Sequence, residues 1–283
     1  MKRNLIMSLG IILAIIISIT LGIFYGNTKI KVSMYDIEDE KIPVSFEDYT
    51  IVQVSDLHNA TFGKKQETLL GAIEQEKPDM VVITGDLIDS SSTDVENAME
   101  FVEGAVKLAP VYYVTGNHEA ATNKYLELEK QLELAGVTIL RNASVEIECE
   151  DYTIQLLGVD DPNFTKTDEM FDMSTGIMKN NLEEMDITDE YTILLSHRPE
   201  LINIYSEYSI DLVLSGHAHG GQVIIPFVGG LVAPNQGFFP EYTEGIHEIN
   251  NTKMIISRGL GNSIIPIRVN NLPELVVIKL HNQ

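Results

Sequence analysis

Apolar residues fall into short blocks along this chain, separated by segments in which apolar and polar positions repeat with a helical period. Met80 to Thr84 is such a block, and a continuous run of this kind is typical of a strand covered on both faces. In the first half, predicted strands and helices alternate, which indicates βαβ units. The strands predicted there are 32–35, 50–54, 80–84 and 111–115, and the helices are 64–76, 93–108 and 123–135.

In the second half, short polar turns separate several of the predicted strands. The segment 160–189 is polar and acidic, and a single helix is predicted in it near 175–184. No internal repeat or linker interrupts 36–283, so this range is predicted to be one catalytic domain. The strands predicted in this half are 138–140, 145–148, 153–159, 191–195, 210–214, 221–225, 254–257 and 275–280.

The first apolar segment differs from all the others because it is much longer. Leu5 to Tyr25 carries no charge, and as a helix it would span roughly 30 Å, the thickness of a bilayer core. A cleaved signal peptide is the alternative interpretation, but its apolar region is normally shorter and a small-residue cleavage site should follow. No such site is found near 22–27, so we expect an uncleaved anchor within residues 1–28.

The charges on either side of this segment favour one orientation. Lys2, Arg3 and the terminal amine precede it, and Lys29 and Lys31 follow it. This slight excess predicts that the amino terminus is cytoplasmic. We therefore expect a single-pass protein of the cell membrane, with its catalytic domain outside the cytoplasm.

Composition restricts the partners. The 283 residues have a formal net charge of −23, which argues against a nucleic-acid partner because such binding needs clustered Lys and Arg. An anionic substrate must then be attracted locally, and bound divalent cations would do so. Cys149 is the only cysteine, so no intramolecular disulfide is possible.

Five motifs rich in Asp, Asn and His stand directly beyond predicted strands. The carboxyl ends of the strands of an open α/β sheet are where ligands bind, so the five loops are expected to meet at one point. Imidazole, carboxylate and amide groups are the ligands of a two-metal hydrolytic site. The motifs are Asp56-Leu57-His58, Gly85-Asp86-Leu87-Ile88-Asp89, Gly116-Asn117-His118-Glu119, Ser196-His197 and Gly216-His217-Ala218-His219.

Taken singly, most of these motifs have an ordinary structural interpretation. Gly85-Asp86 alone is a common turn, and His197 alone is more often a core histidine than a ligand. The pair His217 and His219 is more specific, because two histidines so close in a glycine turn rarely serve packing. The joint occurrence of all five in one order is what favours a metal site.

In this order the motifs resemble those of the calcineurin-like metallophosphoesterases, over roughly residues 50 to 280. The forms Ser55-Asp56-Leu57-His58 and Gly216-His217-Ala218-His219-Gly220-Gly221-Gln222, with the membrane segment, are similar to a membrane-associated bacterial branch that includes enzymes resembling UDP-2,3-diacylglucosamine hydrolases. The resemblance implies an α/β (α+β) fold: a four-layer α/β/β/α sandwich of two mixed β-sheets, preceded here by one transmembrane helix.

The resemblance also implies a role for each motif residue and two divalent transition metal ions (Mn, Fe or Zn). His118 would be the catalytic side chain that donates a proton to the leaving oxygen, and Asp89 would orient it and keep it partly protonated. Asp86 would bridge the two ions. The first ion would be held by Asp56, His58 and His219, and the second by Asn117, His197 and His217.

We therefore expect a membrane-anchored phosphoesterase that hydrolyses a phosphodiester or a pyrophosphate-linked substrate, for example a lipid headgroup. The alternatives are a phosphoprotein or nucleotide phosphatase on the same centre, and an inactive scaffold, which is disfavoured because every ligand position is filled. Arg258 and Arg198 either bind a phosphate oxygen or form surface ion pairs. Phe227, Phe238 and Phe239 either rim the pocket or pack in the core.

Overall fold

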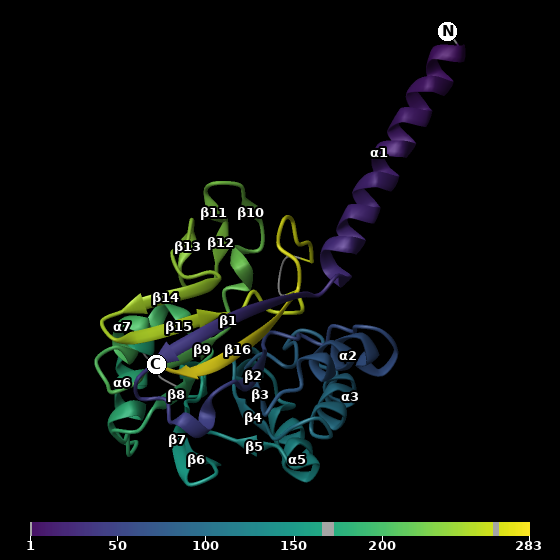
Figure 1. The fold of residues 1–283 in the computed structure, drawn as a ribbon. Coiled ribbons are helices and arrows are strands. Elements are labelled where there is room, and N and C mark those ends of the chain that lie inside the picture. The colour runs from purple at the N-terminus through teal and green to yellow at the C-terminus, as the bar shows by residue number, and fades with distance from the viewer. Residues whose placement is uncertain (1, 166–172, 263–265) are drawn as a thin grey trace.

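The computed structural model describes residues 2–165, 173–262 and 266–283. Two six-stranded mixed sheets are packed together, and helices cover their outer faces (Figure 1). This is the α/β/β/α architecture that the resemblance implies, so the predicted fold class is confirmed.

The first sheet has the strand order β1-β16-β2-β3-β4-β5. Strands β2 to β5 run parallel to one another, and β16 pairs antiparallel with β2 and parallel with β1. Its strands are β1 (Lys31–Asp39), β2 (Tyr49–Val54), β3 (Met80–Thr84), β4 (Val111–Val114), β5 (Thr138–Ile139) and β16 (Glu274–Asn282).

The second sheet has the order β14-β15-β9-β8-β7-β6. Its four middle strands are parallel, and β14 and β6 are antiparallel edges. Its strands are β6 (Ala143–Cys149), β7 (Tyr152–Gly158), β8 (Thr192–Leu195), β9 (Leu212–Ser215), β14 (Gly245–Ile249) and β15 (Thr252–Ile256).

The alternation of side chains along each strand divides the core into layers. In β2, Val52 and Val54 join the apolar cluster under the helices of the first sheet, whereas Ile51 joins the cluster between the sheets. In β8, Leu194 faces the helices of the second sheet and Ile193 faces inward. Because both faces of these strands are buried, they consist of continuous apolar residues.

Helices α2 (Glu67–Glu76), α3 (Val95–Ala105) and α5 (Tyr125–Ala135) cover the first sheet, and α6 (Ser174–Glu183) and α7 (Ile202–Tyr205) cover the second. The short α4 (Asn117–Ala121) lies in the loop after β4. The predicted strand–helix alternation of the first half is thereby confirmed. The helix predicted near 175–184 corresponds to α6; residues 166–172 of the same polar segment lie outside the described residues.

One sequence prediction is wrong. A strand was expected at 221–225, but His219–Gly221 forms a 3-10 turn and only Ile224–Ile225 (β10) is extended. The reason is local: Gly220 and Gly221 have φ of 60° and 69°, outside the β region. Strand β10 instead opens a pair of small hairpins with β11 (Gly229–Gly230), β12 (Val232–Ala233) and β13 (Gly237–Phe238).

Helix α1 (Lys2–Thr28) extends away from the two sheets (Figure 1). Its segment Leu9–Thr28 has a mean hydropathy of 2.4 and is long enough to cross a membrane. Asn27 fixes its last turn: Nδ2 donates to the Pro266 carbonyl at 2.9 Å, and Oδ1 accepts from the Arg268 N–H at 3.1 Å. The chain then enters β1 at Lys31, somewhat before residue 36 where the sequence places the start of the domain.

Candidate metal centre

The motif residues occupy loops at one edge of the paired sheets. Asp56 follows β2, Asp86 follows β3 and Asn117 follows β4, while His197 and His217 follow β8 and β9 of the other sheet. The two sheets are joined beneath this edge by Gln53, whose Nε2 donates to the Ser215 carbonyl at 2.8 Å. The predicted convergence of the loops is therefore present.

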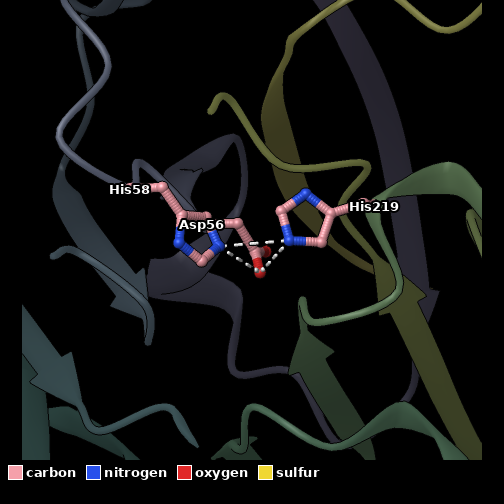
Figure 2. Close-up of side chains that lie close together, drawn as sticks. All are labelled: Asp56, His58 and His219. Atoms are coloured by element: carbon pink, nitrogen blue, oxygen red, sulfur yellow. Dashed lines mark hydrogen bonds and ion pairs between the residues drawn. The ribbon is translucent and has the colours of Figure 1, made fainter. Parts of the chain in front are cut away.

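Asp56, His58 and His219 form a first group of ligand atoms (Figure 2). The Nε2 atoms of His58 and His219 are 3.1 Å apart. Asp56 Oδ1 lies 3.3 Å from His219 Nε2 and 3.9 Å from His58 Nε2. All three residues are buried.

Asp86, His197 and His217 form a second group. His197 Nε2 is 3.1 Å from His217 Nδ1 and 3.2 Å from Asn117 Oδ1. Asp86 Oδ2 lies 3.2 Å from His197 Nε2 and also 3.5 Å from His58 Nε2, a member of the first group. Asp86 therefore stands between the two groups, as expected of a bridging carboxylate.

The spacing of these atoms fits metal coordination. Two nitrogens that bind one ion at 2.0–2.1 Å lie about 2.9–3.3 Å from each other for angles between right and tetrahedral, and both nitrogen pairs measure 3.1 Å. Although burial opposes it, the charges of Asp86 and Asp56 raise the pKa of His197 to about 10. The buried carboxylates thus hold positive charge at this point, and a divalent cation would supply it with release of the proton.

The backbone at the centre is unusual. Five residues of the centre have positive φ, between 45° and 68°, a region that residues other than glycine rarely adopt. They are Asp56, His58, Asp86, His217 and His219. Outliers of this kind cluster at functional sites because the surrounding structure imposes them. Close approach adds a further constraint: a Cβ on Gly116 would overlap the Asp86 carboxylate.

Glu119 has a structural role that the sequence motif did not reveal. Its Oε2 accepts from the backbone N–H groups of Gly116 at 2.7 Å and Asp86 at 2.9 Å, and its Oε1 accepts from Ile88 at 3.2 Å. Burial, reinforced by the charge of Asp86, raises the pKa of Glu119 to about 7. Glu119 thus fastens together the two loops that carry Asp86 and Asn117.

His118 stands at the accessible side of the centre. The Ser90 N–H donates to His118 Nδ1 at 3.0 Å, so the neutral ring carries its proton on Nε2. Asp89 Oδ2 lies 3.6 Å from His118 Nδ1 and 3.5 Å from His58 Nδ1, too far for a direct hydrogen bond to either. Burial lowers the pKa of His118, against the expected partial protonation.

The two arginines expected from the sequence differ in their surroundings, and neither forms a surface pair because both are buried. Arg198 is bound by Asp161, and its Nη1 lies 2.8 Å from Asn235 Oδ1 and 3.4 Å from His217 Nε2. Arg258 Nη2 instead donates to Glu274 Oε1 at 2.9 Å.

A third arginine, which sequence reasoning missed, also reaches the centre. Arg268 Nη2 lies 3.5 Å from His219 Nδ1 and donates to the carbonyls of Gly261 and Arg258 at 2.6 and 2.9 Å. Arg268 follows no strand and lies in no motif, so the sequence carries no local signal for it.

A four-layer α/β fold with a buried cluster of His, Asp and Asn at its strand ends defines a class of metal-dependent hydrolases. The comparison with known proteins identifies the family within this class. The family model described as calcineurin-like phosphoesterase matches residues 49–221, and the chain belongs to that family. It is a metal-dependent phosphoester hydrolase.

Two relatives of similar length come from bacteria, and a longer one comes from a fish. The chain is 28% identical over 275 residues to the uncharacterized metallophosphoesterase YkuE of Bacillus subtilis, covering 93% of this chain and 92% of that protein. It is 31% identical over 258 residues to an uncharacterized metallophosphoesterase of Aquifex aeolicus, covering 89% and 92%. A Danio rerio protein named transmembrane protein with metallophosphoesterase domain is 28% identical over 291 residues, covering 95% of this chain and 62% of that protein.

Proposed function

We propose that this protein is a membrane-anchored phosphoesterase with two divalent transition metal ions, and that it hydrolyses a phosphodiester or pyrophosphate bond in a lipid-linked substrate. The observation that carries the proposal is the pair of buried ligand groups on either side of Asp86, in a chain that begins with an apolar helix. The resemblance to UDP-2,3-diacylglucosamine hydrolases supports the lipid-linked substrate.

We propose the following ligands for the two ions. Asp56, His58 and His219 would hold one, and Asn117, His197 and His217 the other, with Asp86 shared. Several imidazoles disfavour Mg²⁺ and favour Mn, Fe or Zn. When bound, two such ions supply the positive charge that activates a water nucleophile and offsets charge on the phosphate.

The remaining residues act on the substrate or hold those that do. His118, whose tautomer the Ser90 N–H fixes, presents Nε2–H to the leaving oxygen. Asp89 lies 3.5 Å from His58 Nδ1 and steadies that ring by charge, whereas the Ser90 N–H holds the ring of His118. Asp161 engages Nε and Nη2 of Arg198, but Nη1 borders His217, so we propose Arg198 as the arginine that meets a phosphate oxygen. Arg258 instead donates from Nη2 to Glu274.

Metal analysis and a substrate panel test this function together. Purified full-length protein is expected to retain close to two equivalents of Mn, Fe or Zn, and chelation should abolish hydrolysis until metal is restored. We expect turnover of bis-p-nitrophenyl phosphate to exceed that of p-nitrophenyl phosphate, and lipid pyrophosphates to be cleaved. A preference for the monoester, or for nucleotides or phosphopeptides over lipid pyrophosphates, would favour the competing phosphatase function.

Three observations support the membrane location. Helix α1 contains an apolar segment, Leu9–Thr28, that is long enough to cross a membrane, and a relative is named a transmembrane protein. In addition Phe227, Phe238 and Phe239 are exposed on the β10–β13 hairpins, which stand at the end of the body from which α1 leaves (Figure 1). Core packing is therefore wrong for these aromatic side chains, and we propose that they contact the bilayer surface. We place this surface on the extracytoplasmic face, as the flanking charges predict.

Because the chain contains no tryptophan, the fluorescence of a single introduced tryptophan reports how deeply that residue lies in the membrane. In vesicles, Trp fluorescence of Phe227→Trp is expected to shift to the blue and to be quenched by brominated lipids, since aromatic side chains partition to the interface. Tyr152→Trp is the matched control, because Tyr152 is about half exposed (49%) in the β6–β7 hairpin away from α1. Equal quenching of the two variants would contradict the proposed surface.

A further inference from the structure

A pocket of about 680 Å³ lies between the last turns of α1 and the segment that follows Arg268. One wall is apolar and comes largely from α1, through Ile19, Ile23 and Tyr25. Those turns belong to the segment long enough to cross a membrane. Ile19 to Gly26 extends about 10 Å along the helix axis, so this wall offers a slot for part of an acyl chain.

The opposite wall is cationic. Lys31, Arg258 and Arg268 all line the pocket, although the chain as a whole has a net charge of −23. The carboxylates of Glu274 and Glu244 offset the charge of Arg258. The charge that a ligand in this pocket meets therefore comes mainly from Lys31 and Arg268.

Arg268 is the most informative of the three. It is 3% exposed, and its Nη1 has no hydrogen-bond partner. Within the parts of the chain that the structure describes, no carboxylate forms an ion pair with it; its other contacts are carbonyls, Asn262 and His219. Buried charges are normally paired, so the guanidinium of Arg268 makes this wall suited to an anionic group.

From the cationic wall, the apolar wall and their place at the base of α1, we propose that the pocket binds an anionic membrane phospholipid. Its acyl chain lies along α1 and its headgroup faces Lys31 and Arg268. This inference rests on the proposed membrane location. Since Arg268 also lies against His219, the lipid occupies a site directly beside the metal centre.

Lipid binding to the full-length protein tests this proposal without relying on turnover. Metal-free protein in detergent is titrated with phosphatidylglycerol or phosphatidylcholine and bound lipid is counted by native mass spectrometry. We expect phosphatidylglycerol to bind more tightly than phosphatidylcholine. Lys31→Glu should weaken phosphatidylglycerol binding roughly tenfold, because it turns the attraction between residue 31 and the headgroup into a repulsion. Lys29→Glu makes the same charge change two residues earlier, at a different surface hollow, and should have less than a twofold effect.

A second pair of variants tests the apolar wall. A Cβ added at Gly22 or at Gly10 meets no atom within 4 Å, but only Gly22 lines the pocket. Gly22→Leu should therefore fill the slot and reduce phosphatidylglycerol binding at least fivefold, whereas Gly10→Leu should leave it unchanged. Equal effects within either pair, or equal binding of the two lipids, would overturn the proposal.

The fate of the lipid separates this inference from the proposed catalysis. Adding metal to the lipid-loaded protein shows whether the bound phosphatidylglycerol is cleaved or remains intact. Retention of intact lipid with the expected variant pattern supports the pocket, even if no lipid pyrophosphate is hydrolysed and the proposed substrate is wrong. Competition by glycerol 1-phosphate as strong as that by the lipid would contradict an acyl-chain slot.

Discussion

Asp86→Asn is expected to lower kcat/KM by at least about 10³-fold and to remove metal from the protein, because one carboxylate serves both ligand groups. Asp86 Oδ2 lies within 3.5 Å of a histidine from each group. Its other oxygen, Oδ1, accepts a hydrogen bond from the backbone N–H of His118 at 2.8 Å. The Asp86 side chain therefore cannot rotate away without breaking this contact. Loss of its charge leaves the imidazoles without the anion between them.

Metal content, measured by elemental analysis beside the kinetics, is the decisive quantity for Asp86. Asn has nearly the same shape as Asp, so circular dichroism and the thermal midpoint of the metal-free protein should show an intact fold. Asp151→Asn, in the exposed turn between β6 and β7, makes the same chemical change away from the centre and should alter neither metal content nor rate. An unchanged metal stoichiometry in Asp86→Asn would rule out the bridging assignment.

His118→Ala is expected to lower kcat by roughly 10²–10⁴-fold on an alkyl phosphodiester while both metals stay bound. The loss should be much smaller on bis-p-nitrophenyl phosphate, because p-nitrophenolate departs without needing a proton or a strong hydrogen bond. This difference between leaving groups identifies His118 as the group that meets the leaving oxygen. A merely structural residue would lower both rates equally.

Two further measurements complete the test of His118. His281→Ala removes a partly exposed histidine that pairs with Glu47 at 3.0 Å and should leave the rates on both substrates unchanged. His118 also lies within ligand distance of His58 and Asp86. Loss of metal in His118→Ala would therefore make it a ligand and contradict the role proposed here.

The sequence predicts most of the site because its ligands follow strands that are easy to recognise. The strand β3 is a continuous apolar block, so its end is well defined and places Asp86 at the sheet edge. The same holds for β8 and His197. The glycine-rich segment after His219 is different: its short hairpins depend on positive-φ turns, not on any alternation of residues.

Other parts of the site depend on contacts between distant segments, which leave no local pattern. Arg268 lies beside His219 through contacts between distant segments, among them the hydrogen bonds of Asn27 at the end of α1 to the backbone of Pro266 and Arg268. Glu119 was visible in its motif, but its three backbone hydrogen bonds arise only when two strand-end loops lie side by side. The resemblance implied that Asp89 lies beside His118, but its equal closeness to His58 was not predicted, because it depends on two loops meeting.

The left-handed backbone at five of the proposed ligand positions has a consequence for how this enzyme can evolve or be engineered. Each such residue costs roughly 1 kcal/mol relative to an ordinary conformation, which is a sizeable fraction of the margin by which a domain stays folded. Glycine at any of these positions would relax the chain and destroy the chemistry. Selection for thermal robustness alone would therefore drive such a protein toward an inactive fold, and stabilising changes are best sought in the sheets and outer helices.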